Sequence, residues 1–216
     1  PMKRNQTALS AIALLLGAGA VHAGSVTFDT DTYAGGTSIL PPTTTNWDTT
    51  TPPPNPMLLP QFNDSLPGVP AGATLTGITI NWDGVGEFEY RIENIDPNTS
   101  STGTNELIVN LDIFAPAGYT DALSVSSGLL NIDLTAFDGS IDFGGTSGTD
   151  FGVLTGSDSG SFGIAAGDFG AYSGAGDFDL NGTAGSDSDR NISGGDLLEQ
   201  TTWRGGMSAS ITYAFD

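Results

Sequence analysis

Apolar and polar residues alternate along most of the chain after Thr74, and this period of two is typical of β-strands with one buried face. Two such segments follow each other, with apolar faces made of Ile78, Ile80 and Trp82 in one and Phe88, Tyr90 and Ile92 in the other. Asp83-Gly84 lies between them and is a common turn dipeptide. The sequence therefore predicts a β-hairpin of two short strands here.

The same alternation predicts further strands. One segment carries Leu107, Val109, Leu111 and Ile113 on one face and Ile108 and Phe114 on the other. It is predicted as a central strand, because both of its faces are apolar. The other predicted strands are centred on residues 130–134, 141–143 and 207–215, and no window of eleven residues after the first 23 shows a helical period. The predicted fold class is all-β, a β-sandwich or jelly-roll-like domain with glycine-rich turns.

Residues 144–206 are rich in glycine, serine and aspartate and contain scattered aromatic residues. One interpretation is low-complexity disorder. The other is a set of short, glycine-rich strands whose aromatic side chains fill the sandwich, and the spacing of the aromatic residues between small ones favours it. The aromatic residues concerned are Phe151, Phe162, Phe169, Tyr172 and Phe178.

The N-terminal residues have the layout of a secretory signal peptide. Two basic residues precede an apolar stretch over residues 8–20, and Val21-His22-Ala23 places small residues where signal peptidase requires them. The apolar stretch is too short to span a bilayer comfortably. We therefore expect a signal peptide over residues 1–23, a mature chain that begins at Gly24 and has no membrane span, and a secreted or cell-surface protein.

A first predicted strand, Ser25-Val26-Thr27-Phe28, leads into a segment rich in proline and threonine that extends to Pro60. Because proline excludes both a helix and a central strand, this segment is predicted as an extended arm pinned to the core. The predicted organisation is thus a signal peptide over 1–23, an N-terminal strand plus arm over 24–60 and a β-sandwich domain over 61–216.

Composition restricts the chemistry of the mature chain. Residues 24–216 contain three arginines, 25 acidic residues and no lysine, histidine or cysteine, which gives a formal net charge of −22. These absences exclude Ser-His and Cys-His nucleophile pairs, ordinary zinc sites, Schiff-base lysines and disulfides. The acidity also argues against nucleic acid as a partner, because the phosphates would be repelled. We therefore expect no enzyme activity and no cofactor, with calcium the one exception considered.

Several runs of residues resemble one known family. Leu-Pro-Gln-Phe-Asn-Asp-Ser-Leu at 59–66, Glu93-Asn94, FDGSIDFGGTSG at 137–148 and the final strand at 211–215 are similar, in the same order, to choice-of-anchor E domain proteins. The resemblance implies a secreted bacterial surface or extracellular-matrix domain without established catalytic residues. The family usually carries a sorting tail such as PEP-CTERM. The chain shows no recognisable tail of that kind, so release or self-assembly is expected rather than anchoring.

One acidic run has the opening of a calcium loop, with oxygen ligands two residues apart before a glycine. The candidate metal ligands are Asp177, Asp179 and Asn181. Ser188 stands where such a loop needs a bidentate glutamate. The alternative, which this difference favours, is a strand with the three oxygen-bearing side chains on one face and Phe178 and Leu180 on the core side. Residues 187–191 repeat the spacing more weakly.

A carboxylate pair for glycoside hydrolysis is the remaining hydrolytic mechanism for a mature chain without histidine, cysteine or lysine. Trp82 near Glu87 and Glu89 is the best candidate. It stays a remote alternative, because among 25 acidic residues some pair will lie close by chance.

The sequence thus predicts a non-enzymatic secreted structural or adhesive protein, a module of a cell surface or extracellular matrix. One alternative is a module that binds calcium or polysaccharide. Another is a subunit of an extracellular filament that self-associates by strand addition, in which residues 24–36 join the open sheet edge of a neighbouring copy. In that case Val26 and Phe28 would occupy the pockets of the neighbour.

Overall fold

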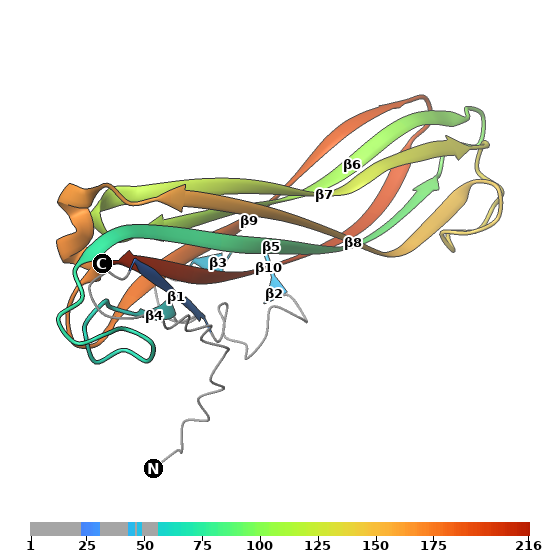
Figure 1. The fold of residues 1–216 in the computed structure, drawn as a ribbon. Helices are drawn as coiled ribbons and strands as arrows, with labels where there is room; N and C mark the ends of the chain where they lie inside the picture. Colours follow the sequence, from blue (N-terminus) through green and yellow to red (C-terminus); the bar gives the residue numbers. More distant parts are fainter. Residues whose placement is uncertain (1–22, 31–42, 46, 49–55) are drawn as a thin grey trace, which may run out of the picture.

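The computed structural model describes residues 23–30, 43–45, 47–48 and 56–216 of the chain, so that most of the predicted signal peptide lies outside the described residues. Two five-stranded antiparallel sheets lie face to face and form an elongated rod (Figure 1). Across the described residues, helix is limited to two short 3₁₀ segments, and none is long and apolar enough to cross a membrane. The all-β fold class predicted from the sequence is confirmed.

The first sheet has the order β1-β10-β5-β8, with β2 also paired to β10. Its strands are β1 (Gly24–Asp29), β2 (Thr43–Thr44), β5 (Leu75–Asn94), β8 (Gly148–Gly163) and β10 (Leu197–Phe215). The second sheet has the order β3-β9-β6-β7, with β4 also paired to β9. Its strands are β3 (Trp47–Asp48), β4 (Met57–Pro60), β6 (Ser101–Ala115), β7 (Tyr119–Leu134) and β9 (Asp177–Ser193). The 3₁₀ segments are η1 (Pro116–Gly118) and η2 (Ala166–Tyr172).

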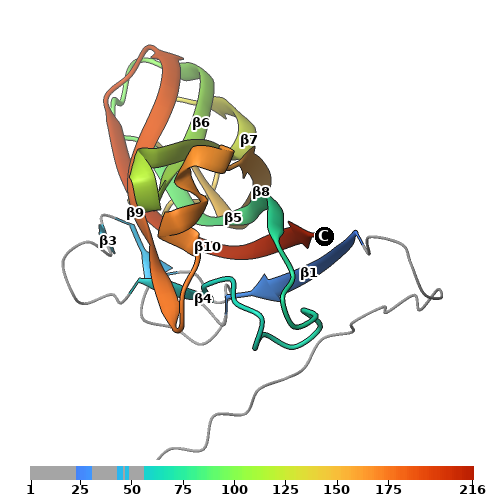
Figure 2. The same cartoon turned by 60° about the vertical axis from the view of Figure 1, so that its left-hand side comes forward.

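The two ends of the rod differ in what they carry. The proximal end, on the left of Figure 1, holds residues 61–74, η1, η2 and the C-terminus. The distal end holds the loops at 95–100, 135–147 and 194–196. Figure 2 turns the proximal end forward and shows the two sheets curling around one core. That core runs along the rod, with its largest fully buried side chains being Trp82, Tyr90, Tyr172, Tyr213, Phe88, Met57, Leu59, Ile80, Ile92, Leu107 and Leu111.

The predicted hairpin at Asp83-Gly84 is wrong. β5 continues through this dipeptide and alternates between buried and exposed positions over 20 residues. A strand of that length spans about 65 Å at roughly 3.3 Å per residue. Gly84 faces the other sheet, and a Cβ there would lie 2.5 Å from Leu111 Cδ1. The glycine therefore permits a close contact between the sheets and does not make a turn.

The glycine-rich segment is ordered, as the spacing of its aromatic residues favoured, but its strands are longer than expected. It forms β8, η2, β9 and the first half of β10. Tyr172 and Phe178 are buried and meet edge to face, with ring centroids 5.1 Å apart. The strand predicted at 141–143 is wrong, because these residues belong to the distal loop and Phe143 has a positive φ of 55°.

The described parts of the N-terminal arm are pinned to the sandwich, as predicted. β1 and β2 pair with β10 in the first sheet, while β3 and β4 pair with β9 in the second. In β4, Met57 and Leu59 are fully buried and Leu58 is exposed. The arm therefore covers neighbouring edges of both sheets and passes from one sheet to the other.

A row of three glycines lies on the inner face of the first sheet at the middle of the rod. Gly205, Gly86 and Gly156 are direct neighbours across β10, β5 and β8. A Cβ on Gly205 would lie 2.8 Å from Val109 Cγ1, and one on Gly156 would collide with the carbonyl oxygen of Ser126. The second sheet therefore packs directly on the backbone of the first at this point.

Replacing Gly156 by alanine is expected to lower the free energy of unfolding by about 1–3 kcal/mol, because the new methyl group meets backbone that has no room to move. For a chain of this size the melting temperature should fall by about 2–4 °C per kcal/mol. Gly185→Ala in β9 is the control, since a Cβ there has nothing within 4 Å. That substitution should leave stability unchanged or raise it slightly. Equal melting temperatures for the two variants would contradict the close approach of the sheets.

Candidate functional sites

β1 lies at one edge of the first sheet and carries both strand-exchange candidates. It pairs with β10 over six positions, from Gly24 opposite Phe215 to Asp29 opposite Ser210. Val26 and Phe28 are partly buried and pack against the core, and the Phe28 ring lies 6.4 Å from that of Tyr213. Thr30 ends the strand by exchanging hydrogen bonds with Ala209. In the structure, the side chains of Val26 and Phe28 therefore pack against a sheet of their own chain.

A buried carboxylate at the distal end holds one of the loops in place. Glu93 is fully buried, although it lies on the outward-facing side of β5 in the strand alternation. Its Oε1 accepts a hydrogen bond from Ser147 Oγ at 2.6 Å, and its Oε2 accepts one from the Phe143 backbone N–H at 2.7 Å. The loop at 135–147 therefore folds over Glu93 and encloses it.

The neighbouring Asn94 forms hydrogen bonds to the loop at 95–100 and to the start of the loop at 135–147, and it packs against the loop at 194–196. Its Nδ2 donates to the carbonyl oxygens of Thr99 and Thr135, at 2.6 and 2.7 Å. Its Oδ1 accepts from the Asp96 N–H at 3.1 Å. A Cβ on Gly195 would lie 2.4 Å from the same oxygen, so only glycine fits beside it. Glu93 and Asn94 together fix the distal loops, and the sequence showed them only as one pair of motif residues.

The calcium candidates lie in a strand. Asp177, Asp179 and Asn181 belong to β9, with Phe178 and Leu180 buried between them. Residues 177–180 pair with β4, and Asn181 stands opposite Phe114 of β6. Side chains two residues apart in a strand are separated by about 6.6 Å and do not wrap around an ion. Residues 187–191 are also extended, and among the described residues no three acidic side chains group as a metal site.

The aromatic side chain and the two acids proposed for glycoside hydrolysis lie on opposite faces of β5. Trp82 is buried inside, where its Nε1 donates to Asp121 Oδ2 at 2.9 Å. Glu87 and Glu89 lie outside, and both bind the guanidinium of Arg204. The predicted arrangement of an aromatic wall beside two carboxylates is therefore wrong.

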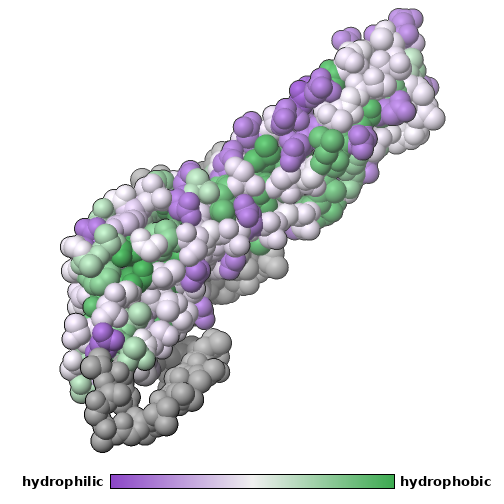
Figure 3. Space-filling model, turned by 45° about the horizontal axis from the view of Figure 1, so that its top comes forward, coloured by the Kyte–Doolittle hydropathy of each residue, from purple (hydrophilic) through white to green (hydrophobic). Residues whose placement is uncertain are grey.

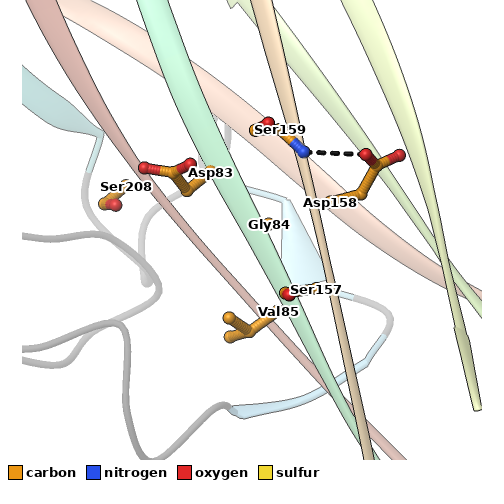
Figure 4. Close-up of a pocket in the computed structure, with 7 residues that line it drawn as sticks. All are labelled: Asp83, Gly84, Val85, Ser157, Asp158, Ser159 and Ser208. Atoms are coloured by element: carbon orange, nitrogen blue, oxygen red, sulfur yellow. Dashed lines mark hydrogen bonds between the residues drawn. The ribbon is translucent and has the colours of Figure 1, made fainter.

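A shallow depression of about 510 Å³ lies over β5, β8 and β10 near the middle of the rod. It is lined by Asp83, Gly84, Val85, Ser157, Asp158, Ser159 and Ser208. Figure 4 shows that its two carboxylates do not converge: Asp83 lies on the side of Ser208, whereas Asp158 lies beyond β8 and accepts from the Ser159 N–H at 2.8 Å. The depression offers hydroxyl groups, and its two acids do not face each other as a catalytic pair would.

The surface charge is strongly negative, and the three arginines among the described residues all pair with carboxylates. Arg91 pairs with Asp150 at 3.1 Å, Arg190 with Glu199 at 2.9 Å, and Arg204 with Glu87 and Glu89. On the face shown in Figure 3, hydrophilic residues and small hydrophobic patches alternate along the rod. Single exposed apolar residues of this kind are ordinary on a protein surface.

Comparison of the chain with protein-family models, curated proteins and solved structures gives no match. The resemblance to choice-of-anchor E domain proteins therefore stays a prediction from the quoted motifs.

Replacing Glu93 by glutamine is expected to lower the free energy of unfolding by about 1–3 kcal/mol, because an amide cannot accept both hydrogen bonds and its NH₂ faces a buried donor. Amide hydrogen exchange over residues 135–147 should become faster. Glu89→Gln is the matched control on the surface, where Arg204 keeps Glu87 and the loss should stay below about 1 kcal/mol. Unchanged exchange in the loop of the Glu93 variant would show that Glu93 does not hold it.

Proposed function

We propose that the chain is a secreted, non-enzymatic structural or adhesive module of a cell surface or extracellular matrix. The proposal rests on what the carboxylate of Glu93 binds. Among the described residues, Glu93 is the one charged side chain that is fully buried. A buried carboxylic acid is the usual candidate for acid–base catalysis. Here both of its oxygens bind the distal loop, and this is a structural task.

The shape of the molecule supports the same proposal. Long strands form a rod whose two ends are each closed by their own loops (Figure 1). At the proximal end Phe62 contacts the rings of Tyr213 and Phe215, with centroids 5.4 and 6.2 Å apart. The quoted motif at 59–66 therefore closes one end, and the motif at 137–148 closes the other. A spacer that holds its ends apart suits a matrix or surface role.

The function is tested by expressing residues 1–216 in a secreting bacterium. The protein should be recovered outside the cell with Gly24 as its first residue, and it should release no reducing ends from cellulose, chitin, xylan or amylose. Retention of residues 1–23 in the cytoplasm would contradict secretion. Sugar release that Glu87→Gln or Glu93→Gln abolishes would contradict the non-enzymatic role.

A filament subunit is the second candidate, and the position of β1 favours it. β1 is short, lies at the edge of its sheet and is hydrogen-bonded to β10 alone. The same contacts form whether the strand comes from its own chain or from a neighbouring copy, so exchange of β1 requires no new interface.

If β1 is exchanged, residues 24–216 should form filaments at high concentration, visible by negative-stain electron microscopy. Phe28→Asp should abolish them and leave a folded monomer, because the charge falls on the partly buried face of the strand. Ser25→Asp places the same charge on the exposed face of β1 and should keep the filaments. Monomers at every concentration, for the wild type and both variants, would eliminate strand exchange and leave the monomeric module.

A further inference from the structure

The outward face of the first sheet changes in character at the middle of the rod. On the distal side it carries the long, charged side chains of Glu87 and Glu89, which both bind Arg204. On the proximal side, the outward residues of β5 from Thr79 to Val85 are all short. They and the residues opposite them on β8 and β10 are serine, threonine, asparagine, aspartate, valine or glycine. We call these residues the short-residue surface.

The depression over β5, β8 and β10 lies at the distal end of the short-residue surface (Figure 4). Asp83 lines it together with its neighbours across the sheet, Ser208 of β10 and Ser159 of β8, and we call these three the serine–aspartate row. In the next row Val85 is half-buried, and its neighbour Gly206 has no side chain. The depression therefore combines an apolar base with oxygen-bearing side chains that reach the solvent.

The serine–aspartate row differs from the rows on either side in its hydrogen bonding. In the next row toward the proximal end, Ser161 Oγ donates to Asn81 Oδ1 at 2.9 Å. On the distal side, Glu87 is held by Arg204. Within the part of the chain that the structure describes, the three side chains of the serine–aspartate row form no hydrogen bond and no ion pair. One carboxylate and two hydroxyl groups are therefore able to bind a ligand.

The strand beneath the depression is fixed by the other sheet. A Cβ on Gly84 would lie 2.5 Å from Leu111 Cδ1, and Trp82 Nε1 donates to Asp121 Oδ2 at 2.9 Å. Short side chains also lose less rotamer freedom than lysine or arginine when they are held in one position. The short-residue surface can therefore bind a partner at a small cost in conformational entropy.

We propose that the short-residue surface binds a neutral polysaccharide, with one sugar ring over Val85 in the depression. A sugar ring has C–H groups on its faces and hydroxyl groups around its edge, which matches an apolar base beside the serine–aspartate row. The charges that line the depression are the carboxylates of Asp83 and Asp158, which would repel an anionic polymer. The arginines offer no counter-charge, because all three among the described residues pair with carboxylates.

The shape of the surface favours a polymer over a free sugar. The depression is shallow and encloses little of a single ring, whereas small-ligand sites bury about 70–90% of the ligand surface. From Val85 to Thr79 the short-residue surface continues for about 20 Å at roughly 3.3 Å per residue, so further rings of the same chain can add contacts. The choice of a polysaccharide also rests on the proposed adhesive role outside the cell.

Native gel electrophoresis of the purified protein, with a soluble polysaccharide in the gel, tests the surface. The neutral polymers are mixed-linkage β-glucan, glucomannan, xyloglucan and dextran, and alginate is the anionic control. We expect retardation by at least one neutral polymer and none by alginate. Asp83→Ala removes the free carboxylate and Val85→Gln fills the depression. Each should raise the dissociation constant tenfold or more.

Each variant has a matched control. Glu89→Ala removes one carboxylate from the same face of β5 outside the depression, and Thr104→Gln adds a similar side chain to the outer face of the second sheet. Both controls should be retarded like the wild type. All four variants should keep a cooperative melting transition, because the substituted residues occupy outward positions of their strands.

Retardation by no neutral polymer, or equal retardation of Asp83→Ala and the wild type, overturns the proposal. A monosaccharide that competes as strongly as its polymer identifies a free sugar as the ligand and overturns the docking of a chain. Self-association of the wild type in analytical ultracentrifugation that Val85→Gln abolishes assigns the surface to a second copy and also overturns it. These failures leave the proposed function standing, since secretion and the absence of hydrolysis are measured separately.

Discussion

The close approach of the two sheets at the middle of the rod determines how this chain builds a core. The glycine row of Gly205, Gly86 and Gly156 brings the backbone of one sheet against Val109 and the Ser126 carbonyl of the other. So close a contact leaves little space between the two sheets for buried side chains. The chain has no disulfides, so its stability depends on the apolar area that it buries. It gains this area through long strands of 15 to 20 residues, which continue on both sides of the glycine row.

Long strands leave long edges, and each edge must be paired or covered. β1 and β2 cover part of β10, and β3 and β4 cover part of β9. The two proposals for the protein therefore depend on the same arm. If the arm stays on its own sheets, the rod is a self-contained spacer. If β1 moves to a neighbour, the edge of β10 that it leaves is the acceptor.

The period of two was enough to predict an all-β sandwich, because each long strand repeats the signal many times. Local signals failed where contacts between the sheets decide the structure. Asp83-Gly84 has the composition of a turn, but Gly84 is needed opposite Leu111. Ile141 and Phe143 alternate like a strand, but the Phe143 N–H binds Glu93, a residue 50 positions earlier in the chain. A charged side chain at an outward position gives no sign in the sequence that a distant loop will bury it.

The buried polar groups of Tyr90, Asn105 and Trp203 were equally invisible to the sequence, where Tyr90 counts as one more aromatic residue on the core face. Burying such groups without a hydrogen-bond partner costs stability. A phenylalanine at position 90 would fill the same space without an unpaired hydroxyl, and the next inward residue after Asn105 on β6 is the buried Leu107. These groups come from three strands, β5, β6 and β10, and lie distal to the stretches of β10 and β9 with which β2 and β3 pair. None of them is exposed to water, so the apolar side chains packed around them must offset the cost of leaving them unpaired.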